Sequence, residues 1–299
     1  METIRSILLN DKDKKEILSI DLSKSHMSKN FTLTKEEILS TKSMIKPYIK
    51  VGYSLQLLFI KNLGRPIPID YKEIPIEILE FIGEQLNITN VNIEKYFTTE
   101  ITRKRNSQHL VEILGYSKFI ITDEITNIAK ILSMNISSKK QLVLEFLDRL
   151  KELKIIAPAL ATVEEFLYQI MQDTNSNIYK DIVFQIPDKI KLDTLLIPDD
   201  KGISPFSHIK NIEINSTAKG LKTLLKHIKF INDFNCPCNL DFLSPEKLRF
   251  FSDEINKSNR FRIQRFSDEN KRYSYLAMFL LFRKKTFVDM VIEINSNFT

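Results

Sequence analysis

Apolar residues recur every three or four positions along most of the chain, which is the spacing that places them on one face of an α-helix. Residues 48–61 (YIKVGYSLQLLFIK) are apolar nearly all round, so we predict a buried helix at the centre of a first domain. Thr34 precedes Glu37 at the capping-box spacing, which predicts a helix start. The chain shows no succession of alternating strands. The pattern therefore predicts an all-α fold.

Residues 77–116 have the order of elements that is typical of a helix-turn-helix. EILEFIGEQLNI predicts a supporting helix, in which Gly83 lets a second helix approach closely. Thr89 is a good N-cap for the next segment, NVNIEKYF, which can bury Val91, Ile93 and Phe97. In a helix-turn-helix the second helix enters the major groove of DNA. We therefore predict that base edges are read by the outward side chains of this segment: Asn90, Asn92 and Lys95.

A basic run follows, with Arg103, Lys104 and Arg105 placed in the first turn of a further helix that Gly115 ends. Cations at that end oppose the helix dipole by roughly 0.3–1 kcal/mol each, so a bound anion would explain them. We expect Thr102 and these three cations to hold DNA phosphates. A solvated basic helix face is the alternative.

The polar loop NISSKK, at residues 135–140, is the candidate linker between two domains. Beyond it, QLVLEFLDRLKEL begins a second helical unit, Pro158 breaks it, and Thr162 is placed to cap the next helix. Helix, turn and capped helix thus occur twice. The prediction is two consecutive helical DNA-binding domains, 1–138 and 139–299, each with a helix-turn-helix-like unit, although no residue-level repeat supports a duplication.

The densest charge cluster lies between residues 257 and 272, where six cations stand against two carboxylates and aromatic residues are interleaved. Guanidinium groups grip phosphate oxygens in pairs, so this stretch predicts a second phosphate-contacting surface. Its candidate residues are Arg260, Arg262, Arg265, Lys271 and Arg272. The alternative is a solvated helix face with buried Phe.

Net charge and composition narrow the class of function. A formal charge of +6 and a pI near 9.0 permit a nucleic acid or an anionic membrane as partner. Lys, Ile and Asn are abundant throughout, as an AT-rich genome would produce, so only clustered charge is informative. The pair Cys236 and Cys238 and four histidines without metal spacing predict no metal site. No apolar run approaches the ~20 residues of a membrane span, and we expect a cytoplasmic protein.

An ordered set of short motifs resembles the N-terminal region of Tn-three family transposases, the large replicative transposases of bacterial transposons. The set comprises FTLT, GYSLQL, LGRP, FIGEQL, Tyr96 with Thr102-Arg103, Gly115-Tyr116, KIIAPALATVEE and RYSYLAMFL. The resemblance implies a bipartite, mostly helical module that binds double-stranded DNA at terminal inverted repeats, within a longer protein that can self-associate. It also implies catalysis by three acidic residues and two Mg ions in an RNase H-like domain outside this chain. We therefore expect no catalytic residue and no cofactor here.

The chain departs from the family pattern at three positions. Thr99 and Glu165 stand where the family usually has Arg, and Asn106 where it has His. The phosphate contacts are then rearranged, or the chain comes from a diverged or degraded element. Asn106 can still hydrogen-bond a phosphate or a base.

Three hypotheses follow from these patterns. The first is the DNA-binding part of a transposase, or a solitary DNA-binding remnant or regulator. The second is an all-helical interaction module whose partner is a protein, including a second copy of this chain. The third is an enzyme in its own right, for which the sequence offers no motif.

Overall fold

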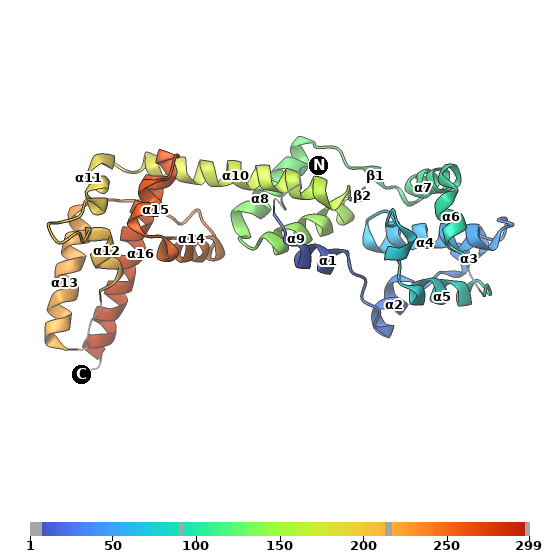
Figure 1. The fold of residues 1–299 in the computed structure, drawn as a ribbon, viewed down its shortest axis with the longest axis horizontal. Helices are drawn as coiled ribbons and strands as arrows, with labels where there is room; N and C mark the ends of the chain where they lie inside the picture. The colour runs from blue at the N-terminus through green and yellow to red at the C-terminus, as the bar shows by residue number, and fades with distance from the viewer. Residues whose placement is uncertain (1–7, 90–91, 213–216, 297–299) are drawn as a thin grey trace. The chain divides into compact units, whose positions relative to one another are not determined.

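The chain is almost entirely helical in the computed structural model, which describes residues 8–89, 92–212 and 217–296 (Figure 1). The all-α prediction is confirmed. Within these ranges, strand structure is limited to β1 (Ser117–Lys118) and β2 (Ile155–Ile156), which pair in parallel. No helix of the described ranges combines the length with the apolar content that a membrane crossing requires.

The chain folds into two compact units. Unit 1 comprises Met1–Ala129 and Ser138–Tyr168, and unit 2 comprises Lys130–Ser137 and Gln169–Thr299. Two helices, α8 (Asp123–Asn135) and α10 (Leu160–Phe184), contribute residues to both. The chain therefore passes between the units at three places, not only after residue 138 as the sequence analysis expects.

Residues 138–168 belong to unit 1 because of contacts distant in the sequence. β2 pairs with β1, and the buried Glu164 accepts a hydrogen bond from the backbone N–H of Leu9 (2.9 Å). Lys14 forms an ion pair with the same carboxylate (3.0 Å). Contacts of this kind leave no signal in local periodicity. The description of the two units as DNA-binding domains with helix-turn-helix-like parts stays a prediction.

Unit 1 is built around α4, whose residues 51–60 are all buried. Its helices are α1 (Asp11–Leu18), α2 (Lys24–Asn30), α3 (Lys35–Ser40), α4 (Pro47–Leu63), η1 (Tyr71–Glu73), α5 (Ile76–Gln85), α6 (Glu94–Thr98), α7 (Glu100–Leu114) and α9 (Lys139–Glu152), besides the shared parts of α8 and α10. Helices α5, α6 and α7 all pack on α4 (Figure 1). The predicted buried helix is confirmed.

The segment before α3 is fixed to α5 by one side chain. Gln85 accepts a hydrogen bond from the Leu33 N–H (2.7 Å) and donates to the Phe31 carbonyl (3.0 Å). Thr34 and Glu37 form the predicted capping box at the start of α3. Two of the sequence motifs, FTLT and FIGEQL, therefore meet in the core of unit 1.

Unit 2 is organised around α16, whose residues 273–280 are buried. Its other elements are α11 (Lys189–Asp193), η2 (Thr194–Leu196), α12 (Pro205–Lys210), α13 (Ala218–Asp233), α14 (Pro245–Lys257) and α15 (Arg260–Gln264), and α16 itself spans Glu269–Ser296. Helices α13 and α14 pack along α16 (Figure 1). Ser244 caps α14, with Pro245 at its first position, as the sequence predicts.

Candidate nucleic-acid interface

A buried chain of polar side chains holds α7 against α4. The Tyr96 hydroxyl donates to Gln56 Oε1 (2.7 Å) and accepts from Asn106 Nδ2 (3.0 Å). Gln56 Nε2 donates in turn to the backbone carbonyl of Arg103 (3.2 Å). Burial raises the pKa of Tyr96 to about 12, so the hydroxyl keeps its proton at neutral pH. Because these buried groups satisfy one another, they fix the rotation of α7 on α4.

Gly52 gives the Tyr96 ring its place against α4. A Cβ atom at position 52 would lie 2.3 Å from Tyr96 Cγ, inside any real carbon–carbon contact. The ring is fully buried. Glycine at this position therefore lets α6, which carries Tyr96, approach the α4 backbone directly.

The outward face of α7 is polar and basic, with Lys104, Arg105 and Gln108 exposed. Lys104 pairs with Glu100 one turn earlier (2.7 Å), and this hydrogen bond holds the pKa of Glu100 below its usual value. Arg105 makes no ion pair with a carboxylate of the described ranges. Exposed pairs such as Lys104 with Glu100 are weak and can yield to a phosphate. This face offers guanidinium, ammonium and amide donors to an anionic partner.

The predicted position of the basic run within its helix is wrong. Helix α7 begins at Glu100, so residues 103–105 lie in its second turn, and the first turn carries a carboxylate that the helix dipole favours. No bound anion is needed to explain the three cations. Thr102 and Arg103 are half-buried, and the Arg103 guanidinium lies 5.4 Å from the centre of the Phe97 ring.

The segment predicted to read bases forms a shorter helix than expected. Helix α6 has five residues and begins at position 94, so Thr89 does not cap it. Asn92 Oδ1 instead accepts a hydrogen bond from the Lys95 N–H (3.3 Å). Asn92 and Lys95 are exposed, as base readers must be, and Asn90 lies outside the described residues.

The structure corrects the role expected for Asn106. Its side chain is 8% exposed and donates to the Tyr96 hydroxyl inside the core. A phosphate or base could reach it only if that hydrogen bond and the packing around it were broken. Asn106 is therefore a structural residue that orients α7.

The second basic cluster is divided between structural and exposed cations. Arg272 lies beside Asp193 (3.5 Å) and Glu269 (3.7 Å) and donates to the Tyr273 hydroxyl (3.0 Å). The ammonium of Lys271 lies 4.6 Å from the Phe266 ring centre, and burial lowers its pKa. These two side chains are committed to the packing of unit 2, so the expectation that they contact phosphate is not supported by their positions.

The remaining cations of the cluster are more accessible. Arg262 is exposed but lies 3.3 Å from Glu254. Arg260 stacks over the exposed Phe261 ring at 4.3 Å, and Arg265 is exposed at the end of α15. Arg260 and Arg265 form no ion pair within the described ranges. They are the better candidates for phosphate contact in this segment.

The site prediction leaves out a row of lysines on α13. Lys219, Lys222, Lys226 and Lys229 are all exposed, at spacings of three, four and three residues, so they share one helix face. The periodicity of this segment indicates a basic face directly.

No three His, Cys, Asp or Glu side chains of the described residues gather closely enough to hold a metal ion. The Cys236 and Cys238 sulfur atoms lie 3.5 Å apart, both partly buried. This pair alone supplies two of the four ligands that a structural zinc ion takes.

Comparison with known proteins gives a matching family and several curated relatives, among them two transposases. The model of a family described as "Domain of unknown function (DUF4158)" matches residues 8–170. The transposase for transposon Tn501 of Pseudomonas aeruginosa is 18% identical over 297 residues, which are 97% of this chain. The transposase for transposon Tn1546 of Enterococcus faecium is 19% identical over 298 residues, 96% of this chain. The chain spans 30% of the length of each of these relatives.

Proposed function

The chain belongs to the family described as domain of unknown function DUF4158, and we propose that it is the DNA-binding N-terminal part of a Tn-three family transposase. Its partner in this proposal is double-stranded DNA at the terminal inverted repeats of a transposon. Similarity to two transposases along nearly the whole chain supports the assignment. The Mg-dependent strand chemistry would belong to a part of the protein outside this chain.

The observation that carries the proposal is the outward face of α7. Its inner side is fixed by buried neutral groups, so Lys104, Arg105 and Gln108 are presented in one orientation. A rigid helix with cations and an amide on its free side matches what major-groove binding requires. In this proposal α7, which has 15 residues, takes the part of the recognition helix. Lys95 of the short α6 and Asn92, just before α6, supply further contacts.

Fluorescence anisotropy tests the proposal with two labelled duplexes. One carries the end sequence of the element that encodes the protein, and the other is a scrambled duplex of equal length and composition. We expect the end sequence to bind at least about tenfold more tightly. Arg105→Ala should lower the affinity for both duplexes by the same factor, whereas Asn92→Ala should reduce the ratio of the two affinities.

Lys42→Ala is the matched control, because Lys42 is an exposed lysine of unit 1 that lies outside α6 and α7. It removes the same charge and should leave the affinity for each of the two duplexes unchanged. Equal affinity for both duplexes, with no effect of Arg105→Ala, would contradict the proposal.

A second candidate, a protein-interaction module, is favoured by one feature of the same helix. Ile101 is 84% exposed and Ile113 is 57% exposed on α7. A surface that docks protein through these side chains would bind with little salt dependence, whereas DNA binding weakens steeply as salt rises. Ile113 lies on the side of α7 opposite Lys104, so Ile113→Ser separates the two functions: it should disrupt self-association or partner binding and leave DNA affinity nearly unchanged.

A further inference from the structure

The lysine stripe of α13, formed by Lys219, Lys222, Lys226 and Lys229, is a charged surface with no structural task in unit 2. The opposite face of the helix, with Leu224 and Ile231 buried, packs against α16. None of the four ammonium groups pairs with a carboxylate of the described residues. Ten residues of helix separate the first lysine from the last, a span of about 15 Å. A row of this length suits an extended polyanion better than a small anion.

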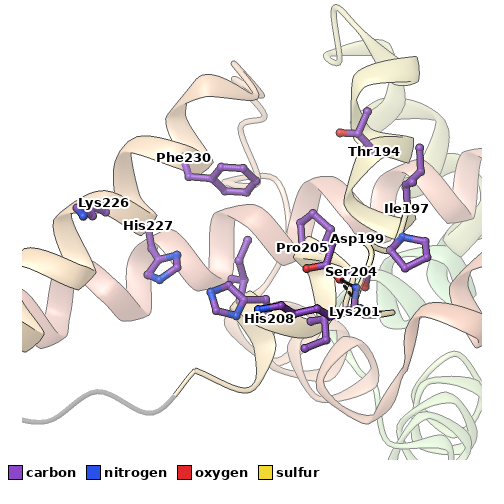
Figure 2. A pocket seen from close by; sticks show the side chains of 13 residues that line it. Thr194, Ile197, Asp199, Lys201, Ser204, Pro205, His208, Lys226, His227 and Phe230 are labelled. Carbon is purple, nitrogen blue, oxygen red and sulfur yellow. Dashed lines mark hydrogen bonds between the residues drawn. The ribbon is translucent and has the colours of Figure 1, made fainter.

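A cavity of about 750 Å³ borders the stripe at Lys226 (Figure 2). From α13 it is lined by Lys226, His227 and Phe230, from α12 by His208, and from the turn before α12 by Lys201. Pockets of ~300–1,000 Å³ are the size that takes small organic groups. One base with its sugar fits such a cavity, and a duplex does not enter it.

Flat rings face this cavity. Phe230 is 37% exposed, and the His208 and His227 ring centres lie 5.3 Å apart (Figure 2). Burial, and then the neighbouring His208, hold the pKa of His227 below its usual value, which favours the neutral form of its ring. Aromatic rings beside a cationic groove are the features on which unpaired bases stack.

The carboxylate that lines the cavity is already engaged. Asp199 Oδ1 accepts hydrogen bonds from the backbone N–H groups of Lys201 (3.0 Å) and Ile203 (2.9 Å), which shape the turn. The lining therefore contains two ammonium groups, those of Lys201 and Lys226. They stand against one carboxylate, Asp199, which is hydrogen-bonded to backbone N–H groups. This balance favours an anionic ligand.

We propose that the α13 stripe and this cavity bind a nucleic-acid strand that carries an unpaired base. The backbone phosphates lie along the lysines, and the base stacks in the cavity against Phe230 and the imidazoles. The proposal rests on the DNA-binding function proposed above and adds to it a site that distinguishes unpaired from paired DNA.

The test compares three probes of one sequence with the full chain: a blunt duplex, the same duplex with a five-nucleotide single-stranded tail, and the isolated strand. We expect the tailed duplex and the strand to bind about five- to tenfold more tightly than the blunt duplex. A 2-aminopurine base in the tail should lose fluorescence on binding, because stacking quenches it.

In the wild type the ring centres of Phe230 and Phe234 lie 5.2 Å apart. Phe230→Leu keeps an apolar group against Phe234 but removes the ring on which a base stacks. This variant should abolish the tail preference and leave blunt-duplex binding unchanged, and Lys226→Ala should reduce the preference severalfold. Lys180→Ala, which removes an exposed lysine of α10, is the matched control and should have no effect.

Equal binding of tailed and blunt duplexes, or a tail preference that survives both Phe230→Leu and Lys226→Ala, would overturn the inference. If blunt duplex still binds through Arg105 in that case, the proposed function stands and only this site is lost. If no probe binds at all, both proposals fail.

Discussion

The two units place their polar and charged side chains differently. In unit 1 the groups that fix α7 are neutral and buried, and the cations Lys104 and Arg105 remain at the surface. In unit 2, cations themselves hold the structure: Lys247 is 2% exposed and donates to the Ser133 carbonyl (3.0 Å), and Arg272 pairs with Asp193. The density of basic residues in a sequence therefore overstates the charge that unit 2 offers to a partner.

We expect the largest effect from a change that disturbs Tyr96, the side chain that links α4 to α7. A Gly→Ala change inside a helix normally stabilises by about 1 kcal/mol, but at Gly52 the new methyl would collide with the Tyr96 ring. We expect Gly52→Ala to lower the free energy of unfolding by about 3 kcal/mol. Urea denaturation measures this. In a Tyr96→Leu background the same change should be far less damaging, and an equal loss in both backgrounds would contradict the packing described.

The neutral network gives the next effect. Tyr96→Phe leaves Gln56 Oε1 and Asn106 Nδ2 without their buried partner, so we expect a loss of about 1–3 kcal/mol in the free energy of unfolding. Tyr53→Phe is the matched control, because within the described residues its hydroxyl meets only Nδ1 of the exposed His109 ring, at 3.4 Å. Thermal and urea unfolding of the two variants should differ clearly. Equal stability would mean that the network does not fix α7.

The buried cation of unit 2 predicts a pH effect. Burial lowers the pKa of Lys247 to about 8, whereas in the unfolded chain the pKa of this ammonium is near its ordinary 10.5. Between these values the unfolded chain binds more protons, so this group makes stability rise with pH from about 8 to 10.5. The rise from pH 7.5 to 9.5 should be on the order of 1–2 kcal/mol.

Lys247→Met isolates that contribution, since tyrosines and cysteines also titrate in this range. The difference in unfolding free energy between wild type and variant should grow with pH in favour of the wild type. Parallel pH profiles of the two proteins would show that folding does not lower the pKa of Lys247.

Local sequence signals predicted the long buried helix and two caps correctly, but misplaced the starts of α6 and α7. The apolar run of α4 and the caps Thr34 and Ser244 depend on residues close in the chain, and they are confirmed. The boundary of the units was not predictable in this way, because Glu164 ties residues 138–168 back to Leu9. Asn106 has the polarity of a surface residue, and its burial depends on Tyr96 from another helix.

The motifs that carry the family resemblance have turned out to be mainly architectural. Gly52 and Gln56 of GYSLQL, Gln85 of FIGEQL, and Tyr96 all lie in the interior contacts of unit 1. The residues on which the DNA-binding proposal depends, Lys104, Arg105 and Gln108, lie outside these motifs. Charge predicted the first two, and it could not predict the neutral Gln108.

The most direct test of the account is the salt dependence of DNA binding by wild type, Arg105→Ala and Arg272→Ala. We predict that the logarithm of affinity falls linearly with the logarithm of salt concentration, and that Arg105→Ala reduces the slope by about 1, as the loss of one phosphate contact requires. Arg272→Ala should leave the slope unchanged, because its guanidinium is held by Asp193 and Glu269. A flat salt dependence, or a slope that falls for Arg272→Ala and not for Arg105→Ala, would contradict the account.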